Sequence, residues 1–146
     1  WYARAVAMAE KTFELSQYLV DVLGSVDVGA SYRGTVTYHE SCHILRGLGI
    51  AAQPERLIQN VQGAHYVPLA NADTCCGFGG EFAATYPDIS GALVKDKVQS
   101  FLDSPAELLI VSEPGCLLNI GGYLHRHHPE KRVMHLAQFL TQGRET

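Results

Sequence analysis

The chain has 146 residues, of which 47% are hydrophobic and 18% are charged, and its formal net charge at pH 7 is −4. This length and balance predict one globular domain spanning residues 1–146. The weak negative charge excludes the basic surface on which nucleic-acid binding depends. No apolar run approaches the roughly 18 residues of a membrane-spanning helix, and no signal-peptide pattern opens the chain, so we expect a cytoplasmic protein. The first residue is Trp1 rather than Met, which indicates a fragment of a longer chain.

The first expected element is a leading amphipathic helix within residues 1–24. Apolar residues recur at alternating intervals of four and three from Tyr2 to Leu23, and Gly24 follows as a typical helix stop. β-branched and aromatic residues predict a strand at 35–39, and Pro54 predicts the start of a short helix. Residues 65–70 predict a second strand, in which Pro68 indicates an edge or a strand end.

The second half of the chain continues this alternation of helices and strands. Pro87 and Asp88 predict the start of a helix, and the apolar run at 108–112 is typical of a buried parallel strand. The buried face of that helix is expected to include Leu93, Val94, Val98, Phe101 and Leu102. Residues 116–124 predict a helix of one or two turns, 125–132 a polar loop, 133–135 a fourth strand and 136–140 a final helix. The pattern predicts an α/β fold with a small, mainly parallel sheet of about four strands flanked by helices.

All four cysteines follow predicted strands. Cys42 comes after the first strand, Cys75 and Cys76 after the second, and Cys116 after the third. Because the carboxyl ends of parallel strands lie along one edge of a sheet, we expect these thiols to converge on one site. The length of the chain and its regular elements argue against a disulfide scaffold. Inert cysteines would be expected inside strands and helices as well.

Converging thiolates select soft metals, namely zinc, copper(I) or iron–sulfur clusters. The chain lacks the short paired-cysteine hooks of most structural zinc sites, whereas a larger cluster can be held from three separate loops. Gly77, Gly79 and Gly80 would let the backbone pass close to such a cluster and lead into a helix, although a tight turn also explains them. Their spacing differs from the dinucleotide-binding fingerprint.

Four local strings carry a family resemblance. They are Tyr38-His-Glu-Ser-Cys-His43, Cys75-Cys-Gly-Phe-Gly-Gly80, Gly115-Cys-Leu-Leu-Asn-Ile-Gly-Gly122 and Val133-Met-His-Leu136. With their spacing, they resemble the cysteine-rich CCG domain of heterodisulfide reductase, the glycolate oxidase iron–sulfur subunit and the lactate-utilisation proteins. The lactate-utilisation branch is the most similar, and residues 33–140 carry the core of the resemblance. It implies a Rossmann-like half of a two-domain protein, the carboxy-terminal one, with a sister CCG domain upstream.

The resemblance also implies a cofactor and a role. Cys42, Cys75, Cys76 and Cys116 would bind an iron–sulfur cluster, expected to be [4Fe–4S]. The chain would transfer electrons in an oxidoreductase complex with other iron–sulfur or flavin subunits, oxidising a small 2-hydroxy acid such as L-lactate (to pyruvate) or glycolate. Two alternatives remain open: thiol–disulfide catalysis of the heterodisulfide reductase kind, and a zinc-stabilised interaction module without redox activity, zinc being a further candidate for the isolated fragment.

One position departs from the heterodisulfide reductase pattern. That enzyme carries a further cysteine where this chain has Asn119, so its five-thiolate non-cubane cluster is not expected here. Four thiolates suffice for an ordinary cluster. Asn119 is interpreted as a weak oxygen ligand, a hydrogen-bond donor to a thiolate, or simply a helix residue.

Histidines complete the list of candidates. His39 and His43 flank Cys42, and His43 is a candidate ligand, donor to a sulfur or proton carrier, with a hydrogen bond to a neighbouring carbonyl favoured. His135 ends the fourth predicted strand and is a weaker candidate for supporting the ligands. A solvated loop is the favoured interpretation of His125, His127 and His128, and no catalytic residue is predicted.

Overall fold

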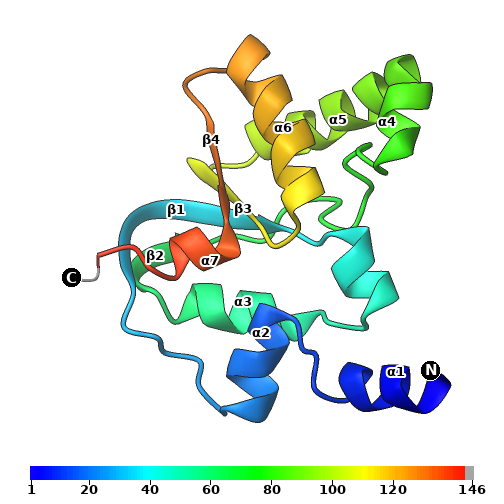
Figure 1. Ribbon diagram of the computed structural model, residues 1–146. Helices are drawn as coiled ribbons and strands as arrows, with labels where there is room; N and C mark the ends of the chain where they lie inside the picture. Colours follow the sequence, from blue (N-terminus) through cyan, green and yellow to red (C-terminus); the bar gives the residue numbers. More distant parts are fainter. Residues whose placement is uncertain (144–146) are drawn as a thin grey trace.

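A four-stranded, fully parallel sheet forms the centre of the protein in the computed structural model, which describes residues 1–143 (Figure 1). The strands are β1 (Ser31–His39), β2 (Gln62–Tyr66), β3 (Leu108–Val111) and β4 (Arg132–His135), in the order β2-β1-β3-β4. Every neighbouring pair is parallel. The predicted α/β fold with a parallel sheet of four strands is therefore confirmed.

Helices cover both faces of this sheet (Figure 1). One face packs on the π-helical turn η1 (Tyr18–Val22), α3 (Ala52–Gln59) and α7 (Leu136–Phe139), with α2 (Leu15–Gln17) against α3. The other face packs on α5 (Pro87–Leu102) and α6 (Pro114–His127). Side chains of a strand alternate between faces, so Tyr38 and Ile110 join the first core while Leu109 and Val111 join the second. The continuous burial of β3 follows from this, because both of its faces are covered.

The strand order creates a switch point between β1 and β3. The chain passes from β1 to β2 on one side and then returns to place β3 on the other side of β1. This order matches the first four strands of the flavodoxin-type doubly wound sheet rather than the 3-2-1 half of the classic Rossmann order. Ligands of such sheets bind beyond the carboxyl ends of the strands at the switch point, which here means the loops after His39 and Val111.

The prediction of a single leading helix in residues 1–24 is wrong. The structure has α1 (Tyr2–Ala9), a non-helical stretch, and then α2 and η1. The break occurs because Glu14 adopts an extended backbone conformation, and its carboxylate accepts hydrogen bonds from the backbone N–H groups of Ser16 and Gln17. This local cap starts a new helix, and α1 buries no residue that could hold the two segments in one line.

Two further boundaries differ from the expectation. The second strand ends at Tyr66, so Pro68 lies beyond it, as expected for a strand end. Helix α6 extends to His127, which places His125 and His127 on a helix rather than in a polar loop. The buried side chains of Ile120 and Leu124 continue one apolar face along this helix, and that packing sustains it through its polar last turn.

The cysteine-bearing connections contain short helical segments. The π-helical turn η2 (His43–Gly47) follows Cys42 directly, and α4 (Glu81–Thr85) follows the glycines, as expected. Cys116 lies in the first turn of α6 rather than in a loop. Within residues 1–143, none of the helices combines the length and the apolar character that crossing a membrane would take.

Candidate metal centre

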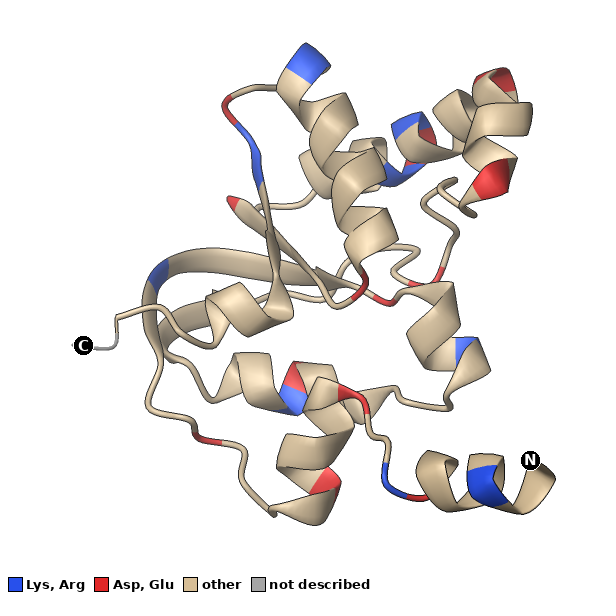
Figure 2. Cartoon of the chain, viewed as in Figure 1, with Lys and Arg blue, Asp and Glu red and all other residues tan. Residues whose placement is uncertain are grey.

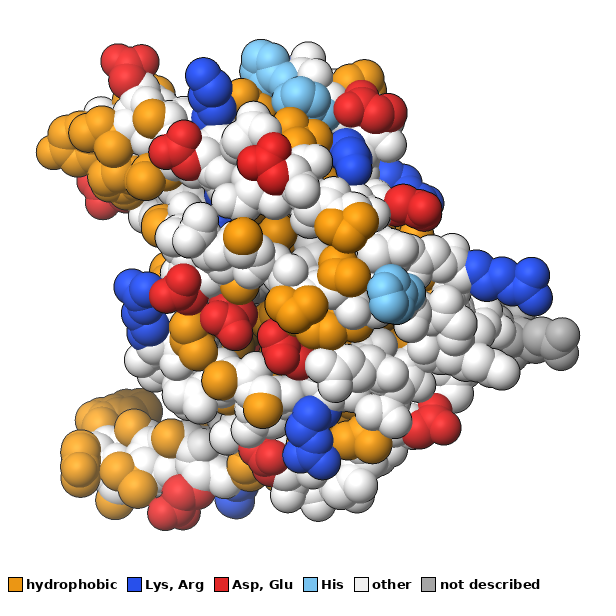
Figure 3. Space-filling model, turned by 180° about the vertical axis from the view of Figure 1, so that it is seen from behind, with side chains coloured by type: hydrophobic (Ala, Val, Ile, Leu, Met, Phe, Trp, Pro, Cys, Tyr) orange, Lys and Arg blue, Asp and Glu red, His pale blue; other side chains and the backbone are white. Residues whose placement is uncertain are grey.

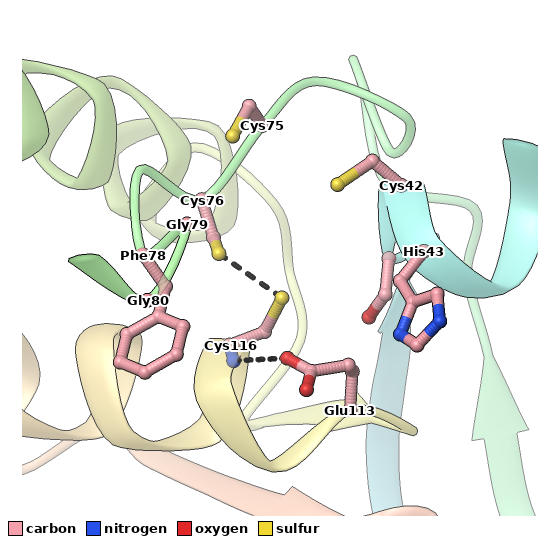
Figure 4. Close-up of a pocket in the computed structure, with 10 residues that line it drawn as sticks. Cys42, His43, Cys75, Cys76, Phe78, Gly79, Gly80, Glu113 and Cys116 are labelled. Carbon is pink, nitrogen blue, oxygen red and sulfur yellow. Dashed lines mark hydrogen bonds between the residues drawn. The ribbon is translucent and has the colours of Figure 1, made fainter. Parts of the chain in front are cut away.

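All four cysteines line one pocket at the carboxyl edge of the sheet. The pocket has a volume of about 260 Å³, and His43, Phe78, Gly79, Gly80 and Glu113 contribute to its wall. Figure 4 shows Cys42 pointing its sulfur from the start of η2 toward the space in front of Cys76 and Cys116. The cysteines thus come together at the switch point of the sheet, where the sequence pattern places them.

Cys76 and Cys116 form the buried inner pair of this pocket. Their sulfur atoms are 3.0 Å apart, and neither residue exposes more than 4% of its surface (Figure 4). Glu113 positions Cys116, because its carboxylate caps α6 by accepting the Cys116 N–H at 2.8 Å. Two sulfurs so close cannot both carry a full negative charge in a buried site.

The inner pair therefore shares one proton. The hydrogen bond from the Cys116 thiol lowers the pKa of Cys76, and His39 and the Phe78 N–H lower it further, against the opposing effect of burial. The pKa of Cys116 is raised by its hydrogen bond to Cys76, by burial and by the nearby Cys76 charge. One thiolate and one thiol result, and a metal ion binding here would displace the remaining proton.

Cys42 and Cys75 form the exposed outer pair. The sulfur of Cys75 accepts a hydrogen bond from the Gly77 N–H at 3.3 Å and lies next to Cys42. Burial is the largest influence on Cys75 and raises its pKa, and the neighbouring thiols Cys76 and Cys42 add to this. The outer pair is the part of the pocket that a metal source or another protein meets first.

His39 is the buried nitrogen donor of the site. Its exposed fraction is 0%, and its Nδ1 lies 3.0 Å from the carbonyl oxygen of Ala72. Because a carbonyl only accepts hydrogen bonds, Nδ1 carries a hydrogen, and in the neutral ring Nε2 keeps a lone pair. Nε2 has no oxygen or nitrogen partner among the described residues, and it lies with the sulfurs of Cys76 and Cys116 in a group of atoms all within 4.8 Å of one another.

Asn119 takes the role of a donor to the backbone. Its Nδ2 donates a hydrogen bond of 2.8 Å to the carbonyl oxygen of Cys76 and so ties the cysteine loop to α6. Its amide therefore holds the loop that carries Cys76. None of the three interpretations drawn from the sequence included this contact.

One acidic residue, Glu113, lines the pocket, and two more lie in the neighbouring loops. Glu40, Asp73 and Glu113 all come from segments that follow strands, and Figure 2 shows acidic positions where these segments leave the sheet. Burial raises the pKa of Glu40, and Glu55 and Asp73 raise it further. Asp73 pairs with Arg46 at 3.2 Å on the surface. The Glu113 carboxylate on the pocket wall favours a bound cation over additional bare thiolates.

Comparison with known proteins identifies the family. The family model described as the CCG cysteine-rich domain matches residues 36–121, which include the four cysteines and Asn119. The chain belongs to the CCG cysteine-rich domain family. It is 52% identical to a lactate utilization protein A from an Exiguobacterium species, 43% to one from Oceanobacillus iheyensis and 49% to one from Geobacillus kaustophilus.

These matches cover nearly all of the chain but only part of each relative. They span 98%, 99% and 96% of this chain, and 58%, 59% and 59% of the respective relatives. The chain thus spans about three-fifths of the length of these lactate utilization proteins.

The other candidate histidines of this CCG domain differ in exposure and in hydrogen bonding. His43 is exposed on the pocket wall beside Cys42. Nδ1 of His135 accepts the Ala137 N–H, so Nε2 carries the hydrogen and donates it to the Ser112 carbonyl oxygen at 3.1 Å. Nε2 of His135 therefore joins the end of β4 to the residue after β3, while Nδ1 caps α7. His125 and His127 are exposed at the end of α6.

Gly77 is required by the packing of the CCG domain. Its φ is +83°, and a Cβ atom there would lie 2.6 Å from the carbonyl oxygen of Ser90 on α5. The space it leaves is taken by α5, while Gly79 and Gly80 line the pocket itself. Gly115 has a packing role that the sequence did not predict. A Cβ atom there would overlap the ring of Phe78, which forms part of the pocket wall.

Lys97 is a buried residue near the site that the sequence did not predict. Its side chain is 1% exposed, and Nζ donates to the carbonyl oxygens of Asn71 and, at 3.1 Å, Ala72. Burial lowers its pKa to about 8, although Asp73 and the thiols Cys76 and Cys116 act in the opposite direction. The signal was present, because Lys97 interrupts the buried face formed by Val94, Val98 and Phe101 on α5.

Proposed function

We propose that this CCG domain binds an iron–sulfur cluster through Cys42, Cys75, Cys76 and Cys116. The observation that carries the proposal is the convergence of four thiols in one pocket at the switch point, with an inner pair whose sulfurs are 3.0 Å apart. Thiolates are the ligands of such clusters, and four of them are the usual number for [4Fe–4S]. The buried lone pair of His39 marks the same space as one that a cation fills.

A bound cluster supplies one-electron transfer. The chain orients the ligands through the Asn119 amide on the Cys76 carbonyl and the Glu113 carboxylate on the Cys116 N–H. The Gly77 N–H donates to the sulfur of Cys75, and the Phe78 N–H donates to that of Cys76. Such hydrogen bonds stabilise sulfur anions, and Gly79 and Gly80 keep the pocket wall free of side chains.

The electron-transfer role is proposed within an oxidoreductase complex that oxidises a small 2-hydroxy acid, with L-lactate to pyruvate as the first candidate and glycolate as the second. The support is the similarity to proteins named lactate utilization protein A. The partners in this proposal are iron–sulfur or flavin subunits that exchange electrons at the exposed outer pair, and the complex is placed in the cytoplasm.

We further propose that an upstream sister CCG domain covers α1. No residue of α1 is buried, and Trp1, Tyr2 and Met8 are 95%, 84% and 68% exposed. Figure 3 shows this apolar segment projecting from the body at the lower left. The support for a covering domain is the greater length of the relatives together with this exposed apolar surface.

A single zinc ion is the second candidate for the site. The group of His39, Cys76 and Cys116 is a nitrogen and sulfur set that zinc accepts, and either outer thiol would supply a fourth ligand. Thiol–disulfide chemistry of the heterodisulfide reductase kind is a third, because the outer thiols are open to an incoming sulfur compound.

Anaerobic reconstitution with iron and sulfide separates these candidates. The proposal predicts a visible charge-transfer spectrum and an EPR signal on reduction, both lost or degraded in Cys76→Ser. A colourless protein with one zinc and no iron would establish the zinc module instead. Thiol–disulfide catalysis predicts that the EPR signal changes when a thiol or a disulfide is added, whereas an electron carrier keeps its signal unchanged.

A further inference from the structure

We propose that His39 is a direct metal ligand of the centre, binding iron through Nε2 beside Cys76 and Cys116. This inference rests on the proposed iron–sulfur function and makes His39 a fifth protein ligand beside the four thiolates, so that one iron would carry two protein ligands. The three ligand atoms lie within 4.8 Å of one another, and all three residues are buried. His39 and the inner thiols therefore form one compact group deep in the pocket.

The orientation of the imidazole ring is fixed by the backbone. Nδ1 donates its hydrogen to the Ala72 carbonyl oxygen at 3.0 Å, which leaves the lone pair of Nε2 facing the thiols. Metal-binding histidines generally donate their other ring hydrogen to a carbonyl or a carboxylate, since this sets the tautomer and the ring orientation. His39 has this arrangement in full.

The carbonyl that orients His39 is itself held firmly. Besides the His39 ring, the Ala72 oxygen accepts the Glu40 N–H at 3.1 Å and the side-chain nitrogen of Lys97 at 3.1 Å. Lys97 approaches from α5 and is 1% exposed. Three donors, two from the end of β1 and one from α5, thus fix one acceptor, as expected where the direction of an imidazole matters.

A hydrogen bond to sulfur is the alternative role of Nε2. With Nδ1 donating to Ala72, only an imidazolium ring could donate from Nε2 to the Cys76 sulfur, a contact that lowers the pKa of this thiol in the metal-free site, whereas a neutral ring offers Nε2 as an acceptor. A metal-bound thiolate is also an acceptor. Two acceptors facing each other in a buried site repel, whereas a cation between them binds both. The geometry therefore calls for a metal bond from Nε2.

Strand β1 brings the ring to this place. His39 and Thr37 share the face of β1 that turns toward α5 and α6, because side chains alternate along a strand. Ser41 follows in the next odd position, is 1% exposed and lies against the Cys116 thiol. The end of β1 and the residues that follow it thus place His39 and Ser41 beside the inner pair, and His39 is the one of the two with a nitrogen donor.

Pulsed EPR of the reduced, reconstituted full chain tests this inference. Histidine carrying a nitrogen isotope label would show the strong hyperfine coupling of a nitrogen bonded to iron, rather than the much weaker coupling transmitted through a hydrogen bond to sulfur. The matched variants are His39→Gln and His43→Gln, since His43 is exposed on the wall of the same pocket.

The expected result is a strong coupling in the wild-type protein that is retained in His43→Gln and lost in His39→Gln. If His39→Gln fails to fold, the wild-type and His43→Gln spectra still decide. A reducible cluster without the strong coupling, or a coupling that disappears in His43→Gln or persists in a folded His39→Gln, overturns this inference alone. A protein that assembles no cluster overturns the proposed function and this inference with it.

Discussion

The contact between Asn119 and the cysteine loop leads to a prediction whose sign distinguishes two roles. In Asn119→Asp the amide that donates to the Cys76 carbonyl is replaced by an acceptor of nearly the same shape. Loss of this hydrogen bond and of the partner of a buried carbonyl costs about 1–3 kcal/mol. If the loop must be ordered to bind metal, affinity falls about 5- to 150-fold, since 1.4 kcal/mol corresponds to about tenfold.

Competition with a chelator measures this affinity in the reconstituted protein. Leu118→Ala is the matched control, because Leu118 is the neighbouring residue on α6 and is 68% exposed. Asn119→Asp should lose its metal at lower chelator concentrations than Leu118→Ala and the wild type. If Asn119 were an oxygen ligand, the carboxylate would bind the metal more tightly than the amide. Equal or tighter binding in Asn119→Asp would therefore refute the positioning role.

Two further predictions concern the packing beneath the site. Gly77→Ala should lower the free energy of unfolding by about 2–4 kcal/mol, because it combines a left-handed φ with a clash against α5. Gly91→Ala, where the space is open, should raise it by about 0.5–1 kcal/mol, and equal effects in denaturant unfolding would contradict this account. Lys97 has a pKa lowered from 10.5 to about 8, so the unfolded chain binds more protons at this residue between those pH values. The free energy of unfolding of the metal-free protein, relative to that of Lys97→Met, should therefore rise with pH through this window. A difference that stays constant with pH would show that burial does not lower the pKa of Lys97.

Elements with a strong local pattern were predictable from the sequence. The continuous apolar run of β3 and the proline-initiated helix α5 appear at their expected places, with Val94, Val98 and Phe101 buried. The convergence of the four cysteines was also predictable, because parallel strands end at one edge and each cysteine follows a strand.

The errors arise where one side chain or tertiary packing decides the outcome. The Glu14 carboxylate interrupts a helical period that continues across it, and local apolar spacing contains no sign of this. Helix α6 continues through a polar segment because Ile120 and Leu124 pack on the sheet.

The roles of the supporting residues could not be predicted for a related reason. His39, Lys97 and Asn119 act through contacts with Ala72 and Cys76, and each of these contacts joins residues at least 25 positions apart. Such pairs depend on how the elements dock. The sequence marks only the residue types, of which a lysine in an apolar helix face is the clearest sign.

Metal analysis of the protein purified anaerobically from its own cells tests the central claim most directly. Iron and acid-labile sulfide in cluster proportions, with an EPR signal on reduction that requires Cys42, Cys75, Cys76 and Cys116, is the result that this account predicts. One zinc ion per chain, with neither iron nor sulfide, would contradict it.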